Sequence, residues 1–378
     1  MKDKMKNKLK NKLKNKLKNK LKNCFKHNKK NKINSIFVLF CFLFLSLFLS
    51  SCGKPPLIEK EAYLFGTRIE VLVADEEKEK GEQAISAVLK EFQRIHQTYH
   101  AWQPSLLNDL NQSILNNKLF LLTDEMRFFI QNAQELSLKS DGLFDPGIGN
   151  LIALWGFHSD EFKSNLPDLN QINLFLKEKP SIQQLEIKNN YLYSYNKNIS
   201  LDFGGYLKGW ALDKAAKILK ENNIHHALIN IGGNIMVLGT KFGKPWRIGI
   251  QHPRMPSPLA VLNLNDGEAI GTSGDYQRYF EFENKRYHHL LNPKTGFPAD
   301  KTMAVTILMP KNQYAGLYSD VYSKPIFISG DDWQHYIQKL KLKNVLRINQ
   351  NGEIEITRSF YNRLEFLNDS EKIKIVDE

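Results

Sequence analysis

Hydrophobic and polar residues are patterned along the first third of the folded part of the chain in two distinct ways. Alternation of apolar and polar positions predicts a strand over residues 62–73, and apolar residues at helical spacing predict a helix over residues 78–99. A loop is expected over residues 102–111. A second helix is expected over residues 124–140, because its first turn carries the acids that favour a helix N-terminus. This part of the chain therefore mixes helices and strands.

The remainder of the chain continues this mixture. A hairpin is expected over residues 185–201 around Asn189-Asn190, and the clearest helix over residues 206–222. Further strands are expected over residues 226–238, 246–250, 259–264 and 304–308. A helix is expected over residues 331–342, followed by two short strands around an Asn-Gly turn. The order of elements predicts an α+β fold, with largely antiparallel or mixed sheets flanked by helices.

The N-terminal segment has a different pattern. The motif Lys-Asn-Lys-Leu repeats with a period of four, and an apolar run over residues 36–49 follows. This run is shorter than the roughly 20 residues of a membrane-spanning helix. Leu-Ser-Ser-Cys ends the run, and this pattern resembles a lipobox. We therefore expect a lysine-rich signal peptide over 1–51, a lipidated Cys52, a tether over 52–61, a folded domain over 62–368 and a tail over 369–378. An uncleaved signal anchor is the alternative.

The charge of the chain is concentrated in this leader. Residues 1–32 contain 15 lysines and one acid, a net charge of +14 against +13 for the whole chain, so the remainder carries −1. Nucleic acid is therefore not an expected partner of the folded domain. Cys52 would be the only cysteine left after cleavage, so we expect no disulfide and no thiolate metal site there.

The densest cluster of chemically useful residues lies between residues 271 and 299. Thr272, Ser273 and Gly274 are interpreted as a turn that brings main-chain N–H groups close to an anion. His288 and His289 follow a strand-like run, so their side chains face opposite sides and only one can enter a given site. One of the two is expected to be catalytic and the other structural.

A second candidate precedes the clearest helix. Asp202 comes before the Gly204-Gly205 turn, and Lys208 lies in the first turn of the helix. Helix N-termini bind phosphate through exposed N–H groups, and a lysine adds a full charge, so this placement suits a dinucleotide whose adenine or ribose donates to Asp202. An ordinary connection between a strand and a helix, with a surface lysine, is the alternative.

Five segments in order resemble the ApbE family of FAD:protein FMN transferases. They are residues 65–67 (FGT), 141–157 (DGLFDPGIGNLIALWGF), 201–213 (LDFGGYLKGWALD), 230–234 (NIGGN) and 271–299. The resemblance implies a T-fold-like domain. It also implies transfer of FMN from FAD to a threonine or serine hydroxyl through a phosphoester bond, with magnesium required and AMP released.

The resemblance also assigns roles to individual residues. The implied contacts to FAD are Phe65, Tyr99, Leu143, Phe144, Asp145, Asp202, Lys208, Thr272, Ser273, Gly274 and Leu291. Trp155 and Phe157 are interpreted as core residues. His289 matches the family's base, in a pattern where Asn292 replaces aspartate and removes a charge near the predicted site.

The implied magnesium ligands are the Gly205 carbonyl, Asp320 and Ser323, with lysine at position 324 where the family carries threonine. An ammonium has only donors to offer, whereas magnesium needs oxygen ligands. Four interpretations stay open: Ser323 or water completes the metal shell, Lys324 contacts the pyrophosphate itself, turnover is impaired, or Lys324 is a solvated surface residue.

Three activities remain compatible with the sequence: the transferase, an FAD-binding lipoprotein without transfer activity, and an FAD pyrophosphatase that yields FMN and AMP. For the transferase, the expected acceptors are exported or membrane-bound respiratory and electron-transfer proteins with an Asp-Gly-x-Ser/Thr-Gly/Ala-Thr motif. The expected location is the extracytoplasmic (periplasmic) face of the inner, cytoplasmic membrane, through the lipid anchor.

Overall fold

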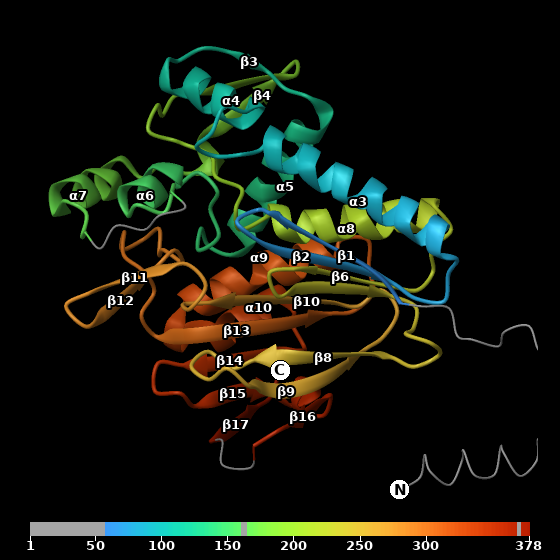
Figure 1. Ribbon diagram of the computed structural model, residues 1–378. Coiled ribbons are helices and arrows are strands. Elements are labelled where there is room, and N and C mark those ends of the chain that lie inside the picture. Colours follow the sequence, from blue (N-terminus) through green and yellow to red (C-terminus); the bar gives the residue numbers. More distant parts are fainter. Residues whose placement is uncertain (1–56, 160–164, 369–371) are drawn as a thin grey trace, which may run out of the picture. The chain divides into compact units, whose positions relative to one another are not determined.

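A nine-stranded sheet forms the centre of the folded part of the chain (Figure 1). The computed structural model describes residues 57–159, 165–368 and 372–378; the predicted signal peptide and Cys52 lie outside them. Within those ranges, no helix combines the length and the apolar character needed to cross a membrane.

The strands of the central sheet run in the order β1-β2-β6-β7-β10-β13-β14-β15-β17. All neighbours pair antiparallel except β15 and β17, which pair parallel. The strands are β1 Ile58–Leu64, β2 Thr67–Val73, β6 Ala227–Ile231, β7 Asn234–Leu238, β10 Ala269–Gly274, β13 Thr302–Met309, β14 Val345–Asn349, β15 Ile354–Thr357 and β17 Ile373–Val376. The predicted α+β architecture with mixed sheets is confirmed.

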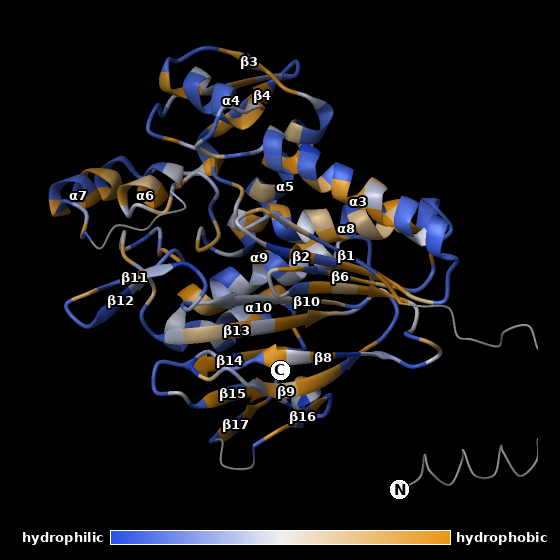
Figure 2. Ribbon diagram, viewed as in Figure 1, coloured by the Kyte–Doolittle hydropathy of each residue, from blue (hydrophilic) through white to orange (hydrophobic). Residues whose placement is uncertain are grey.

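Both faces of this sheet are covered. Three helices, α3 Lys78–Thr98, α8 Leu207–Glu221 and α9 Ala315–Ile328, pack on one face, and Figure 1 shows α3 and α8 beside β1, β2 and β6. The other face packs against a small sheet of β8 Trp246–Gln251, β9 Pro258–Leu264 and β16 Leu364–Phe366. Central strands such as β7 are therefore buried along their whole length, and Figure 2 shows mostly hydrophobic residues along β6 and β9.

The remaining elements flank the central sheet and its helical layer, and α11 packs against β15 and β17 at one edge of the sheet. A third, small core joins α6 and α7 to the hairpin β11–β12, through residues that include Leu151, Trp155, Phe157 and Phe280. The bounds are α4 Leu106–Leu115, β3 Phe120–Leu121, α5 Asp124–Lys139, α6 Gly149–Leu154, α7 Leu169–Glu178, β4 Leu185–Lys188, β5 Tyr191–Ser194, β11 Tyr279–Phe282, β12 Lys285–His288, α10 Trp333–Leu340 and α11 Arg358–Tyr361. Short 3₁₀ turns cover Ile182–Gln184 and Gly330–Asp332.

Several predicted boundaries were wrong. The strand expected over residues 62–73 is the hairpin β1–β2, since Phe65 and Gly66 turn the chain with φ of 56° and 69°. The strand over 226–238 is likewise two strands around Gly232-Gly233. The expected loop 102–111 contains the start of α4, because the Ser105 hydroxyl caps that helix by accepting from the Asn108 N–H.

The two ends of the predicted domain also differ from the structure. Four residues assigned to the tether, Ile58–Glu61, form part of β1 and pair with β2. The predicted tail includes β17, which pairs with β15 at the edge of the main sheet. Both segments are short, and they are stabilised by cross-strand pairing together with the burial of Ile58 and Val376 in the core.

Candidate active site

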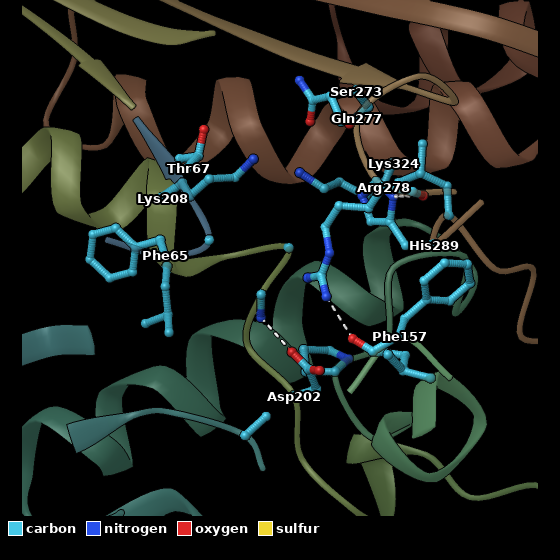
Figure 3. A pocket seen from close by; sticks show the side chains of 18 of the residues that line it. Phe65, Thr67, Phe157, Asp202, Lys208, Ser273, Gln277, Arg278, His289 and Lys324 are labelled. Carbon is cyan, nitrogen blue, oxygen red and sulfur yellow. Dashed lines mark hydrogen bonds between the residues drawn. The ribbon is translucent and has the colours of Figure 1, made fainter. Parts of the chain in front are cut away.

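A cavity of about 910 Å³ opens where the end of the helical layer meets the hairpin β11–β12. Its walls come from the β1–β2 turn, the end of α3, the loop before α6, the N-terminus of α8 and parts of β10 and α9. Figure 3 shows Phe65, Thr67 and Lys208 on one side of the pocket, with Arg278, His289 and Lys324 on the other. This volume lies at the upper end of the roughly 300–1,000 Å³ of typical ligand sites.

The two adjacent histidines have separate environments, as the predicted alternation requires. His288 is buried, its Nε2 donates to the Ala299 carbonyl at 2.8 Å, and its Nδ1 accepts from the Leu290 N–H. His289 lines the cavity, with Nδ1 3.2 Å from the Arg278 carbonyl oxygen. A carbonyl oxygen only accepts, so Nδ1 of the neutral ring carries the proton and Nε2 is the nitrogen that can take one.

The protonation state of His289 follows from its surroundings. Burial lowers the pKa of His289 well below its ordinary value, and the charges of Arg278, His288 and Lys208 lower it further. The ring is therefore neutral at physiological pH, the state that a general base needs.

The N-terminus of α8 lies at the cavity as expected. Lys208 lines the wall, and the Asp202 carboxylate accepts from the Gly204 N–H at 2.7 Å and from His158 Nε2 at 2.9 Å. His158 in turn stacks on Trp102, with ring centroids 5.0 Å apart. Burial acts to raise the pKa of Asp202, but its hydrogen bonds and the charge of His158 outweigh burial, so this pKa lies below its ordinary value. Asp202 is thus an ionised acceptor held in the wall.

Lys324 pairs with Asp320, one of the implied metal ligands. Its Nζ donates to the Asp320 main-chain carbonyl at 2.8 Å and also contacts Asp320 Oδ1, while Oδ2 accepts from the Gly209 N–H at 2.9 Å. Burial lowers the pKa of Lys324, and the Asp320 charge opposes this. The same ammonium holds the pKa of Asp320 below its usual value, although burial acts to raise it. The two side chains form a buried ion pair that faces the cavity through Lys324.

Glycines allow α8, α9 and β10 to approach closely enough to build this pair. A Cβ at Gly209 would lie 2.5 Å from the Gly316 carbonyl oxygen of α9, and one at Gly271 would lie 2.2 Å from the Ser319 carbonyl oxygen. Backbone atoms cannot give way at such distances, so both positions require glycine. The close approach also brings Ser273 of β10 within 2.6 Å of Ser323 on α9.

One predicted feature of this region was wrong. Thr272, Ser273 and Gly274 form the end of β10 rather than an anion-binding turn, since they pair with Thr306, Val305 and Ala304 of β13. The side chains alternate, and the Thr272 hydroxyl bonds to that of Thr306. Gly274 does not line the cavity.

The other predicted contacts divide into cavity wall and supporting structure. Phe65, Leu143, Phe144 and Leu291 line the wall directly. Tyr99 lines it too, but its hydroxyl donates to Glu125 at 2.8 Å.

Asp145 lines the cavity and also holds the loop before α6 in place. It accepts from the N–H groups of Gly147 and Ile182 and from the Ser181 hydroxyl. Burial raises the pKa of Asp145.

The structure also confirms one smaller interpretation and revises two others. Trp155 is a core residue as predicted, with Nε1 donating to the Gly296 carbonyl at 2.8 Å. Phe157 is buried but also lines the cavity, so it is not only core. Asn292 accepts from the Lys294 N–H at 2.9 Å within its own turn and does not line this cavity, so the missing charge at this position lies outside the site.

Sequence reasoning missed several lining residues. Thr67 and Gly232 lie within the family segments 65–67 and 230–234, and Gln277 and Arg278 lie within the segment 271–299. The family resemblance therefore marked the segments that contain these residues, although it did not single them out. Trp102 gave no signal, because only the fold brings it against Arg278, 5.7 Å from the indole centroid.

The amino-acid sequence is similar to those of one known protein family. The sequence model of the ApbE family matches residues 65–346. An FAD:protein FMN transferase of Rhodobacter capsulatus is 31% identical over 311 residues, covering 82% of this chain and 59% of that protein. One of Escherichia coli K12 is 27% identical over 240 residues, covering 61% of this chain and 67% of that protein. The chain thus matches less than two thirds of the length of the first relative.

Solved structures give the same picture for the fold. The ApbE protein of Thermotoga maritima superimposes with a TM-score of 0.74 at 28% identity, covering 82% of this chain and 99% of that one. A flavinyl transferase ApbE of Pseudomonas stutzeri superimposes with a TM-score of 0.71 at 23% identity, covering 83% and 98%.

Proposed function

The chain belongs to the ApbE family, and from that premise we propose that it transfers FMN from FAD to a threonine or serine hydroxyl of an acceptor protein, with AMP as the leaving group. The relatives named above as FAD:protein FMN transferases support this activity. The observation that carries the proposal is His289, a neutral imidazole whose Nε2 can accept a proton, in a cavity that Lys208 and Lys324 also line.

The proposed step follows from this geometry. The acceptor hydroxyl attacks the FMN-side phosphorus of FAD, and His289 Nε2 takes the hydroxyl proton. A new P–O bond forms, the bond from that phosphorus to the bridging oxygen breaks, and AMP leaves with that oxygen. The proton then passes from His289 to AMP or to solvent. Lysine charges beside the pyrophosphate stabilise the negative charge that develops on the leaving group.

The magnesium implied by the resemblance does not fit the residues as they stand. Asp320 Oδ1 and the Asp320 carbonyl both accept from Lys324, and the Ser323 hydroxyl donates to the same carbonyl at 2.6 Å. A divalent cation bound here would need the Asp320 carboxylate and the Ser323 oxygen as ligands, and the ammonium bonded to Asp320 would repel it. No step of the proposed mechanism therefore depends on the metal.

Intact mass spectrometry of an acceptor tests the activity. The full chain is incubated with FAD, magnesium and an acceptor domain that carries the Asp-Gly-x-Ser/Thr-Gly/Ala-Thr motif. A gain of one FMN, absent when the acceptor Thr or Ser is replaced by alanine, supports transfer. Free FMN and AMP with an unmodified acceptor would instead establish a pyrophosphatase. FAD retained without any product would establish a binding protein.

We also propose that the protein is exported and anchored by lipid on Cys52 at the extracytoplasmic face of the inner membrane. The lysine-rich leader, the apolar run and the Leu-Ser-Ser-Cys pattern support this location. Acceptors would then be exported or membrane-bound electron-transfer proteins. Metabolic labelling with an alkynyl fatty acid should mark the chain, and Cys52→Ser should abolish the label; equal labelling of both would refute the anchor.

A further inference from the structure

The ammonium of Lys324 lies where the family pattern leads us to expect a metal ion. We propose that in this chain Lys324 itself supplies the positive charge beside the FAD pyrophosphate, so that FAD binding and FMN transfer need no divalent cation. The identity of the substrate rests on the function proposed above. The role of Lys324 as an internal cation rests on its own contacts.

The first argument is the occupancy of the oxygen atoms. Lys324 Nζ bonds to the carbonyl and to one carboxylate oxygen of Asp320, the residue four positions earlier on α9. The second carboxylate oxygen accepts from the Gly209 N–H. Asp320 is fully buried, so these are the partners that compensate its charge. Without these partners Asp320 would be an uncompensated buried charge, and Lys324 is therefore an integral part of the site.

The second argument is the state of Ser323. Its single hydroxyl proton goes to the Asp320 carbonyl at 2.6 Å, and so the Ser273 hydroxyl, also 2.6 Å away, donates to Ser323. Both serines are buried and mutually satisfied. Ser273 lines the cavity, and the Ser323 hydroxyl already accepts one hydrogen bond and donates another within the protein, so it is poorly placed to serve as a metal ligand.

The third argument is the position of Gly205 next to the Lys324 side chain. The Lys324 side chain lies against Gly205, where an added Cβ would come within 3.2 Å of Lys324 Cε. Gly205 is in the turn before α8 and lines the same cavity. The Lys324 stem thus lies beside Gly205 while its ammonium bonds to Asp320, and both of these residues are implied metal ligands. Only about 11% of the Lys324 side chain is exposed, and this exposed part faces the cavity.

Three cationic side chains at the site can face an anionic substrate. Lys208, Arg278 and Lys324 line the cavity. The Asp145 and Asp202 carboxylates in the same wall accept hydrogen bonds from protein groups, and Asp320 pairs with Lys324. In the transfer step, Lys324 donates hydrogen bonds to phosphate oxygens as the bond to the bridging oxygen breaks, and it neither gains nor loses a proton. This is the electrostatic part of the role that a metal ion would have.

Two variants of the full chain test the assignment. Lys324→Met removes the charge and keeps the length, and Lys324→Thr restores the residue type of the family pattern. Lys217→Met is the matched control, since Lys217 lies on the exposed side of α8 with 68% of its side chain accessible. FAD affinity is measured by quenching of flavin fluorescence, with EDTA and with excess magnesium, and FMN transfer is measured in the same solutions.

The wild type and Lys217→Met should bind FAD equally well in EDTA and in magnesium. Lys324→Met should bind FAD on the order of 10- to 100-fold more weakly in both, the effect of losing a charged hydrogen bond. Lys324→Thr should bind weakly in EDTA and recover in magnesium. If magnesium strengthens wild-type binding several-fold, or if Lys324→Met binds as the wild type does, the assignment is wrong.

Two further results separate this assignment from its premises. Transfer that is absent in every sample, with the expected binding pattern intact, would refute the proposed transferase and leave the lysine assignment standing. If Lys324→Met fails to fold because Asp320 is left unpaired, the double variant Asp320→Asn/Lys324→Met removes both charges. It should fold and show the same weak, magnesium-independent binding; wild-type affinity in the double variant would overturn the proposal.

Discussion

Gly209→Ala tests the close packing that builds the site. The new Cβ would lie 2.5 Å from the Gly316 carbonyl oxygen, 2.7 Å from Leu317 Cα and 2.7 Å from Asp320 Cβ. Ordinary contacts of a methyl group begin near 3.4 Å, so α8 and α9 must separate by roughly 1 Å. That shift also weakens the 2.9 Å hydrogen bond from the Gly209 N–H to Asp320 Oδ2.

The expected size of the effect combines three contributions. Overpacking costs about 1–3 kcal/mol, and losing a hydrogen bond to a charged group costs about 1.5–3 kcal/mol. The higher helix propensity of alanine returns about 1 kcal/mol. The free energy of unfolding should therefore fall by about 1.5–5 kcal/mol, together with a loss of FAD affinity because Asp320 and Lys324 move.

Equilibrium urea unfolding, followed by far-ultraviolet circular dichroism, measures the free energy. Lys217→Ala, an exposed position on the same helix, serves as control and should change stability by less than about 0.5 kcal/mol. A Gly209→Ala protein with the stability of the wild type and unchanged FAD affinity would refute the argument that α8 and α9 need glycine at their crossing.

Three further predictions concern other parts of the site. Because the pKa of His289 is lowered, the base stays unprotonated as pH falls, and the initial transfer rate should be flat between about pH 8 and 6.5. His289→Asn should abolish transfer and keep FAD binding. A wild-type rate already halved near pH 6.5, or an active His289→Asn variant, would contradict the role of His289 as base. Asp145→Ala removes the acceptor of three hydrogen bonds and should lower the free energy of unfolding by about 2–4 kcal/mol in the same urea assay. An unchanged unfolding midpoint would show that the loop before α6 does not depend on Asp145. Trp155→Phe loses one hydrogen bond to the Gly296 carbonyl and should cost about 1–2 kcal/mol. FAD affinity by flavin fluorescence should not change in that variant, and a clear loss would place Trp155 in the binding site.

Amphipathic elements were predictable from the sequence, and elements without a polar face were not. The helix expected over residues 206–222 is α8, Leu207–Glu221, because its apolar residues recur on one side. Helix α9 was not predicted, since nearly all of its residues are buried and no period separates two faces. The hairpin around Asn189-Asn190 was predictable because both residues adopt the positive φ that asparagine tolerates.

Glycine-rich segments were harder to interpret. The sequence predicts a turn around residues 271–274. In the structure, glycine is needed at position 271 because β10 packs against the backbone of α9, whose contacting residues lie some 50 positions away in the chain. A glycine required for close approach and a glycine required for a turn look the same in one sequence. Only the packing distinguishes them.

The sequence by itself determined which residue types were available for chemistry: the histidine pair, the lysine after the Gly204-Gly205 turn, and a lysine at position 324 in place of threonine. It also determined that His288 and His289 face different environments, because alternation is a local property of the backbone. The tertiary structure decided which histidine enters the cavity and that Lys324 pairs with Asp320 rather than with solvent. These outcomes depend on contacts among α8, α9 and β10, and the distance between such elements is set by packing and not by the order of residues.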